Sequence, residues 1–268
     1  QVIGTIIASF LPVGAISHIY YADRLNQLPL AIFGIALGIV LLPSLSKAIK
    51  QSDQETTNNI QNRSIEFSLL ISLPSAIGLF ILAEPIIQIL FERGAFVKED
   101  TYYTAKVLSY FALGLPAYII IKVLVSCFFA REDTKTPLYI SVVSVILNVV
   151  LSLLLIGSMR EMGIAVATAI SAWVNALLLY LFLAIRNHMK FDDLLVRNSI
   201  KILLSSFLLF AGIYILNGLF FTNITGNSVL LNSILLLLMI FLAIIIYFGL
   251  VIVLKVLSVN QLRKYLKK

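Results

Sequence analysis

The chain has 268 residues, of which 60% are hydrophobic and 12% are charged, and its mean hydropathy is +1.01. Water-soluble domains carry roughly 25% charged residues. These few charges exclude a soluble fold of this size, and we expect an all-α integral membrane protein. The formal net charge of +7 fits basic loops on the cytoplasmic side of a membrane, so we expect no nucleic-acid partner.

The apolar segments predict about eight membrane-spanning helices, because each spanning helix needs about 20 apolar residues. The first segment is short and begins at residue 1, with no Met and no charged region before it. We interpret it as a helix cut in its middle, and the chain as the C-terminal portion of a longer protein. In chain order, the predicted spans are residues 1–14, 20–46, 64–91, 103–130, 137–158, 162–186, 198–221 and 229–256.

The connections between these spans alternate in charge. Lys and Arg gather in the links at 47–63, 131–135 and 186–201 and in the tail at 255–268, whereas the other links are poor in them or mix both signs. Because basic loops stay on the cytoplasmic side, we expect a multi-pass protein with a cytoplasmic C-terminus. The sequon NIT at 223–225 is interpreted as a loop.

Asp23 and Arg24 lie between two long apolar runs, in the stretch SHIYYADRLNQLPL at 17–30. An arginine at the centre of a spanning helix costs about 2.5–3.5 kcal/mol, so it usually faces a cavity or a partner. The residues alone leave two interpretations open. The pair lies at headgroup depth with Tyr20 and Tyr21, or Arg24 lines a cavity where its guanidinium holds a phosphate through two hydrogen bonds.

Other polar residues interrupt the later spans. Lys122 is close enough to the end of its span to extend to the interface, or it has a role in transport. Asn148 and Ser152 are four residues apart and share a helix face, and Thr168 lies on the next span. Such residues either hydrogen-bond between packed helices or contribute to an ion site.

Prolines also interrupt the apolar runs, as they often do in transporters. Glu84 precedes Pro85 and predicts a kink or a broken helix end. The other prolines within apolar runs are Pro29, Pro43, Pro74 and Pro116.

The sequence contains no motif of ordinary enzyme chemistry: no HExxH, no paired-cysteine zinc spacing, no GxxxxGK[ST] and no GxSxG. His18 and His188 are far apart, and neither has a ligand-like neighbour three or four residues away. The single cysteine, Cys127, allows no disulfide within one chain. We therefore expect no enzyme, no metal site and no cofactor.

Four motifs together resemble the MurJ/MviN lipid II flippases of the multidrug/oligosaccharidyl-lipid/polysaccharide exporter superfamily. They are YYADRLNQLPL at 20–30, GIALGIVLLPSLSK at 34–47, ILFERGAF at 89–96 and FFAREDTKTP at 128–137. They occur in the family's order, and the resemblance covers nearly all of the chain.

The resemblance implies a fold of fourteen helices, with two six-helix lobes and a C-terminal pair. This chain would supply helices seven to fourteen, with the seventh truncated. Residues 1–188 would form the C-terminal lobe. Residues 189–268 would form the helix pair, with a hydrophobic groove for a lipid tail and a basic cytoplasmic tail.

The resemblance also implies that Arg24, in the YADRL motif, is a residue of a central cavity and is needed for function. We group Asp23, Gln27 and Lys122 with it as substrate-binding candidates. The implied function is translocation of lipid II across the bacterial cytoplasmic (inner) membrane by alternating access. The implied partners are lipid II, membrane lipids and cell-wall synthesis enzymes.

Some members of the family hold a sodium ion with carboxylates in helices seven and eleven and with nearby Asn and Thr groups. Asn148 and Thr168 match the neutral ligands, but Gly4 and Ser152 occupy the acidic places. Asn148, Ser152 and Thr168 therefore remain candidates for an ion site or a helix-packing cluster, and the coupling ion stays open.

Two alternatives remain beside lipid II transport. One is an exporter of another polyprenyl-linked glycan or of a drug within the same superfamily. The other is a non-transporting membrane scaffold for cell-envelope synthesis.

Overall fold

A computed structural model describes residues 2–220 and 229–256, and within these ranges it contains helices and turns but no strand. The all-α prediction is confirmed. The predicted sequon at 223–225 and most of the basic tail lie outside the described residues. The helices of the described ranges are α1 (Val2–Ala8), α2 (Ala15–Lys50), α3 (Gln54–Ile81), α4 (Ala83–Phe91), α5 (Lys98–Phe129), α6 (Lys135–Met159), α7 (Glu161–Ile185), α8 (Asp193–Phe220) and α9 (Val229–Val253).

Six helices in the described ranges are long and apolar enough to cross a membrane: α3, α5, α6, α7, α8 and α9. The expected count of eight is not reached among them. Helix α1 has only 7 residues, and the 36-residue α2 is not among the six. The chain is nevertheless a multi-pass membrane protein by length and composition.

The predicted span at 64–91 is divided in two by a break at Leu82, between α3 and α4. Pro85 explains the position of the break, because it has no N–H to donate to the carbonyl of Ile81. The kink predicted at Glu84 is therefore confirmed. The other four prolines lie inside helices that continue past them: Pro29 and Pro43 inside α2, Pro74 inside α3 and Pro116 inside α5.

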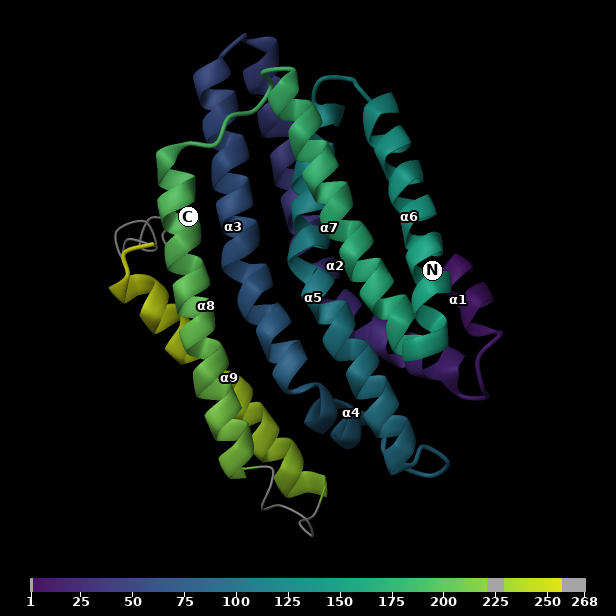
Figure 1. The fold of residues 1–268 in the computed structure, drawn as a ribbon. Coiled ribbons are helices and arrows are strands. Elements are labelled where there is room, and N and C mark those ends of the chain that lie inside the picture. Colours follow the sequence, from purple (N-terminus) through teal and green to yellow (C-terminus); the bar gives the residue numbers. More distant parts are fainter. Residues whose placement is uncertain (1, 221–228, 257–268) are drawn as a thin grey trace.

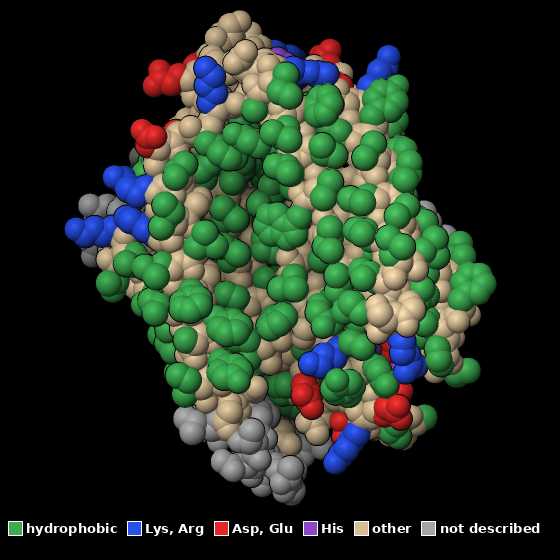
Figure 2. All heavy atoms as spheres, in the orientation of Figure 1, with side chains coloured by type: hydrophobic (Ala, Val, Ile, Leu, Met, Phe, Trp, Pro, Cys, Tyr) green, Lys and Arg blue, Asp and Glu red, His purple; other side chains and the backbone are tan. Residues whose placement is uncertain are grey.

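The helices run between two ends of the molecule, which Figure 1 shows at the top and the bottom of the view. We call the top the basic end; it carries the links at 51–53, 130–134 and 186–192. The opposite end carries the links at 9–14 and 92–97 and the turn between α6 and α7. On the face in Figure 2, charged side chains gather toward these two ends, and hydrophobic side chains cover most of the surface between them.

Helix α5 is the centre of the bundle and packs against α2, α3, α4 and α7. In its most apolar 18-residue window 67% of the residues are buried, against 33% or less in the other five candidate spans. Small residues permit this close packing. A Cβ added at Gly114 would lie 3.0 Å from the backbone Cα of Ala169 in α7.

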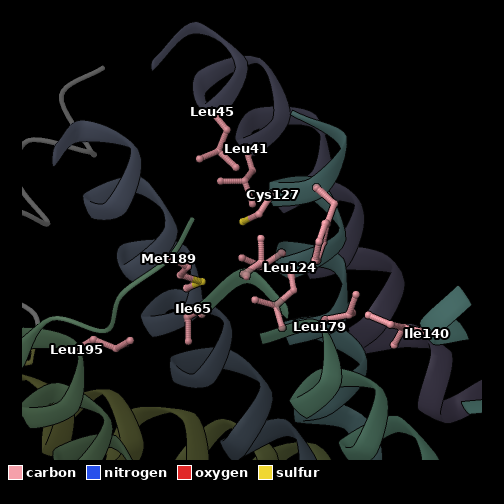
Figure 3. Packing of buried hydrophobic residues seen from close by; sticks show 12 residues of the cluster. Leu41, Leu45, Ile65, Leu124, Cys127, Ile140, Leu179, Met189 and Leu195 are labelled. Carbon is pink, nitrogen blue, oxygen red and sulfur yellow. The ribbon is translucent and has the colours of Figure 1, made fainter. Parts of the chain in front are cut away.

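The basic-end core consists of apolar side chains from α2, α3, α5, α6, α7, the link after α7 and the start of α8. Figure 3 shows these side chains converging on Leu124 and Cys127 of α5. Cys127 is fully buried there. The buried members are Leu41, Leu45, Ile65, Val123, Leu124, Cys127, Phe128, Ile140, Leu179, Leu183, Met189 and Leu195.

Helices α8 and α9 form the outer side of the molecule. Helix α8 packs against α3, and α9 packs against α8 and α4. Tyr247 of α9 is buried, and its hydroxyl donates a hydrogen bond to the carbonyl oxygen of Leu70 in α3 at 2.7 Å. This bond satisfies a polar group in an otherwise apolar contact.

Ion pairs hold the links together at the basic end. Arg63 of α3 donates two hydrogen bonds to the carboxylate of Asp192, both at 2.7 Å. In the link between α5 and α6, Asp133 accepts hydrogen bonds from the backbone N–H and hydroxyl of Thr136 and from Arg186, at 3.0, 2.7 and 2.6 Å. The last of these joins the start of α6 to the end of α7.

We predict that Asp133→Asn lowers the stability of the protein at neutral pH by about 1 kcal/mol, allowing for solvent screening of this partly exposed pair. Burial disfavours the charge of Asp133, but the hydrogen bonds from Thr136 and Arg186 outweigh burial and lower its pKa from 3.8 to about 2. The stabilisation is therefore complete above about pH 4 and is lost as the pH falls toward 2.

Unfolding of purified protein in detergent, followed at pH 7 and at successively lower pH, measures this effect. The difference between wild type and Asp133→Asn should shrink as the pH falls. Glu132→Gln removes an exposed charge in the same link and is the matched control. A difference that stays constant with pH would contradict the prediction.

Candidate functional site

A cavity of about 640 Å³ lies between α2, α5 and α7. We call it the polar cavity because charged, amide and hydroxyl side chains stand among its lining residues, although most of its wall is apolar. Helix α2 contributes most of its wall, α5 contributes three residues and α7 contributes one. The lining residues are Asp23, Asn26, Gln27, Leu30, Ala31, Gly34, Phe111, Tyr118, Lys122 and Thr168.

Three of the four predicted substrate-binding residues, Asp23, Gln27 and Lys122, line this cavity. Asp23 and Gln27 are four residues apart and share a face of α2, where the Gln27 amide donates a hydrogen bond to Asp23. Lys122 reaches the cavity from α5, and its Cγ would lie 3.7 Å from a Cβ added at Gly34. The cavity therefore has one cation, one carboxylate and several amide and hydroxyl groups at its wall.

Arg24, the fourth predicted residue, is exposed on a neighbouring face of α2 and does not line the cavity. Its guanidinium carbon lies 4.7 Å from the centre of the Tyr20 ring. A cation–π contact of this kind at an exposed position contributes about 0.5–1 kcal/mol. The contact orients the guanidinium of Arg24, which carries five N–H donors of the kind that bind an anion.

Of the three residues predicted to form a polar cluster between α6 and α7, two are joined by a hydrogen bond and Ser152 is not. Asn148 donates a hydrogen bond to the Thr168 hydroxyl at 3.1 Å, and that hydroxyl donates to the carbonyl of Ile164 at 2.7 Å. Ser152 is fully buried, and its hydroxyl has no hydrogen-bond partner among the described residues. The described ranges contain no group of His, Cys, Asp and Glu suited to a metal ion.

A second cavity, of about 390 Å³, lies between α2, α3 and α4 on one side and α8 and α9 on the other. Its wall is almost entirely apolar. Because Pro29 and Phe33 lie beside Leu30 and Gly34 on α2, this helix lines both cavities. The lining residues are Pro29, Phe33, Leu70, Ile71, Pro74, Ser75, Gly78, Leu79, Leu82, Ile86, Leu209, Ile213, Ile240, Ala243, Ile244, Tyr247 and Phe248.

A buried cluster around His18 is the feature that the sequence analysis missed. One ring nitrogen of His18 lies 3.0 Å from Glu161, and the other lies 3.0 Å from Asp100. The search for neighbours three or four residues away could not find partners that are 143 and 82 residues distant. A signal was present in the topology, because all three residues lie near the starts of spans predicted to begin on the same side of the membrane.

Comparison with known proteins identifies the family. The family model described as "Lipid II flippase MurJ" matches residues 1–237. The chain belongs to this family. It is 45% identical over 205 residues to a "Probable lipid II flippase MurJ" of Rhizobium tropici, a match that covers 76% of this chain and 38% of that relative. A relative of the same description in Rickettsia prowazekii is 49% identical over 174 residues, covering 65% of this chain and 34% of the relative.

The chain therefore spans about two fifths or less of the length of these MurJ relatives. A solved structure of a multidrug/oligosaccharidyl-lipid/polysaccharide superfamily transporter from Pyrococcus furiosus has a similar fold. Its TM-score is 0.61 at 17% sequence identity, and the match covers 93% of this chain and 60% of that one. This likeness supports the exporter fold expected from the four motifs.

Proposed function

We propose that the protein carries lipid II, the lipid-linked peptidoglycan precursor, across the bacterial cytoplasmic membrane. The observation that carries this proposal is the pairing of two cavities along α2. A cavity with Asp23, Gln27 and Lys122 at its wall lies beside a more apolar cavity that is bounded on one side by α8 and α9. An amphiphile with an anionic, sugar-bearing headgroup and a long hydrocarbon tail matches both.

The family supports the same substrate, because the relatives in Rhizobium and Rickettsia carry the description of a lipid II flippase. Residues 1–188 would act as one lobe of an alternating-access transporter. Residues 189–268 would form the helix pair that covers the tail. Membrane lipids would surround the protein, and contacts with cell-wall synthesis enzymes stay a prediction, as does the absence of enzymatic activity.

We expect Arg24 to bind the pyrophosphate of the headgroup. It lies one position along α2 from Asp23 in the cavity wall, and its guanidinium is exposed. Arg24→Ala removes the charge. Arg24→Lys keeps the charge but loses the planar fork that holds phosphate oxygens in pairs. Both variants should therefore lower the amount of lipid II exposed at the outer face of the membrane by tenfold or more.

The assay uses the complete reading frame in cells depleted of their own flippase, at matched protein levels. Arg93→Ala, which removes an exposed arginine in the link at 92–97, is the control and should retain full exposure. Full exposure with Arg24→Ala would favour the alternative of a non-transporting scaffold. Loss of exposure of a different lipid-linked glycan, with lipid II unaffected, would favour another exporter of the superfamily.

The apolar cavity gives a separate prediction for the lipid tail. Gly78 lines this cavity, and an added Cβ there would meet no heavy atom within 4 Å. Gly78→Phe should fill the cavity without forcing the helices apart and should lower transport several-fold. Gly212→Phe is the matched control, because Gly212 of α8 also has open space around it but lies outside the lining. Equal transport by both variants would contradict the prediction that the lipid tail binds in this cavity.

We also propose that the basic end and the C-terminus lie in the cytoplasm, because Lys and Arg residues concentrate there. Alkaline phosphatase, which is active only outside the cytoplasm, should be inactive when fused after Lys268 and active when fused after Arg93. The reverse pattern of activity would show that the basic end lies outside the cytoplasm and would contradict the proposed topology.

A further inference from the structure

The cluster around His18 ties together three helices at the end opposite the basic end. His18 is in the first turn of α2, Asp100 is in the first turn of α5 and Glu161 is the first residue of α7. His18 is 5% exposed, and the Glu161 side chain is fully buried. The Asp100 side chain is 29% exposed, so it is the member of the cluster that water reaches most easily.

The two contacts of His18 require a proton beyond those of a neutral imidazole and two carboxylates. Nδ1 lies 3.0 Å from Glu161 Oε1, and Nε2 lies 3.0 Å from Asp100 Oδ1. A neutral imidazole has one N–H donor and one lone pair, whereas an ionised carboxylate can only accept. If all three groups were in those forms, one nitrogen lone pair would face a carboxylate oxygen at hydrogen-bond distance.

The groups around His18 favour the charged imidazolium. The Tyr103 ring of α5 stacks on the His18 ring at 5.7 Å between centres. Arg160, just before α7, lies with its guanidinium 4.9 Å from the same Tyr103 ring and with Nε 3.6 Å from Glu161 Oε2. Among the described residues, the charged groups in contact with His18 are therefore two carboxylates, and the cation Arg160 is directed toward Glu161.

Asp100 also has a structural role that depends on its orientation. While one oxygen contacts His18, the other accepts a hydrogen bond from the backbone N–H of Val97 at 2.8 Å and so caps α5. The same carboxylate therefore makes both the contact with His18 and the cap at the start of α5. His18 is five residues before Asp23, so it lies about 8 Å along the α2 axis from the polar cavity.

We propose that His18, Asp100 and Glu161 form a proton-binding site that fastens α2 to α5 and α7 at this end of the molecule. With the proton bound, His18 is an imidazolium and donates to both carboxylates. When the proton leaves, His18 keeps the contact with buried Glu161 and loses the one with Asp100. The start of α5 is then released from α2. The inference goes beyond the proposed transport function and does not depend on the identity of the lipid.

The first test is the protonation state of His18 in the complete protein, labelled with ¹⁵N-histidine and held in lipid nanodiscs. The ¹⁵N chemical shifts distinguish an imidazolium from either neutral tautomer. The signals of His18 are those that disappear in His18→Gln. We expect both ring nitrogens to carry a proton at pH 7, where a free histidine is mostly neutral. A neutral His18 at pH 7 would overturn the proposal, and this measurement on the wild type does not depend on the folding of a disruptive variant.

The second test is whether the proton controls the start of α5. Hydrogen exchange of residues 98–103, corrected for the intrinsic effect of pH, should rise about tenfold as His18 loses its proton. In Asp100→Asn the exchange should not rise when His18 loses its proton, because the contact no longer depends on an ion pair. Glu99→Gln removes the exposed neighbouring carboxylate, and its exchange should rise as in the wild type. Exchange that stays constant while His18 titrates would overturn the fastening role.

Discussion

The interior of a bilayer contains no water, so each helix must satisfy its own backbone, and helices associate through close packing and a few polar contacts. In this chain the packing is centred on α5, which is more buried than the other candidate spans. Helices α2, α3, α4 and α7 make the most extensive contacts with it. The orientation of each of them, and hence of the side chains that line the cavities, follows from how closely it approaches α5.

Helix α2 shows this dependence most directly. Its buried residues Ala22 and Leu25 pack into the same apolar cluster as Leu108 and Phe111 of α5. This contact turns Asp23 and Gln27 toward the polar cavity and leaves Arg24 exposed on the neighbouring face. Because successive residues on a helix are about 100° apart, Arg24 points about 100° away from Asp23 around the axis of α2.

Hydropathy and prolines were sufficient to predict most of the helices and the break before α4. The predicted spans at 137–158 and 162–186 match α6 (Lys135–Met159) and α7 (Glu161–Ile185) to within two residues. Three of the four substrate-binding candidates line one cavity: Asp23 and Gln27, which lie in the first motif, and Lys122, which interrupts a later span. The sequence could not separate Asp23 from Arg24, because the direction of a side chain around a helix depends on packing against α5. The His18 cluster was missed for a related reason: its members are distant in sequence and meet only when three helix ends come together.

The burial of Cys127 has a practical consequence for chemical labelling. It is the single cysteine of this sequence, and it lies at 0% exposure among Leu41, Leu124 and their neighbours in the basic-end core. A thiol reagent reaches only the thiols that solvent reaches. Cysteines introduced at exposed positions on α2 or α5 would therefore react selectively in this part of the protein. Spin labels or fluorophores attached there can report the distance between two helices while the native Cys127 remains in place.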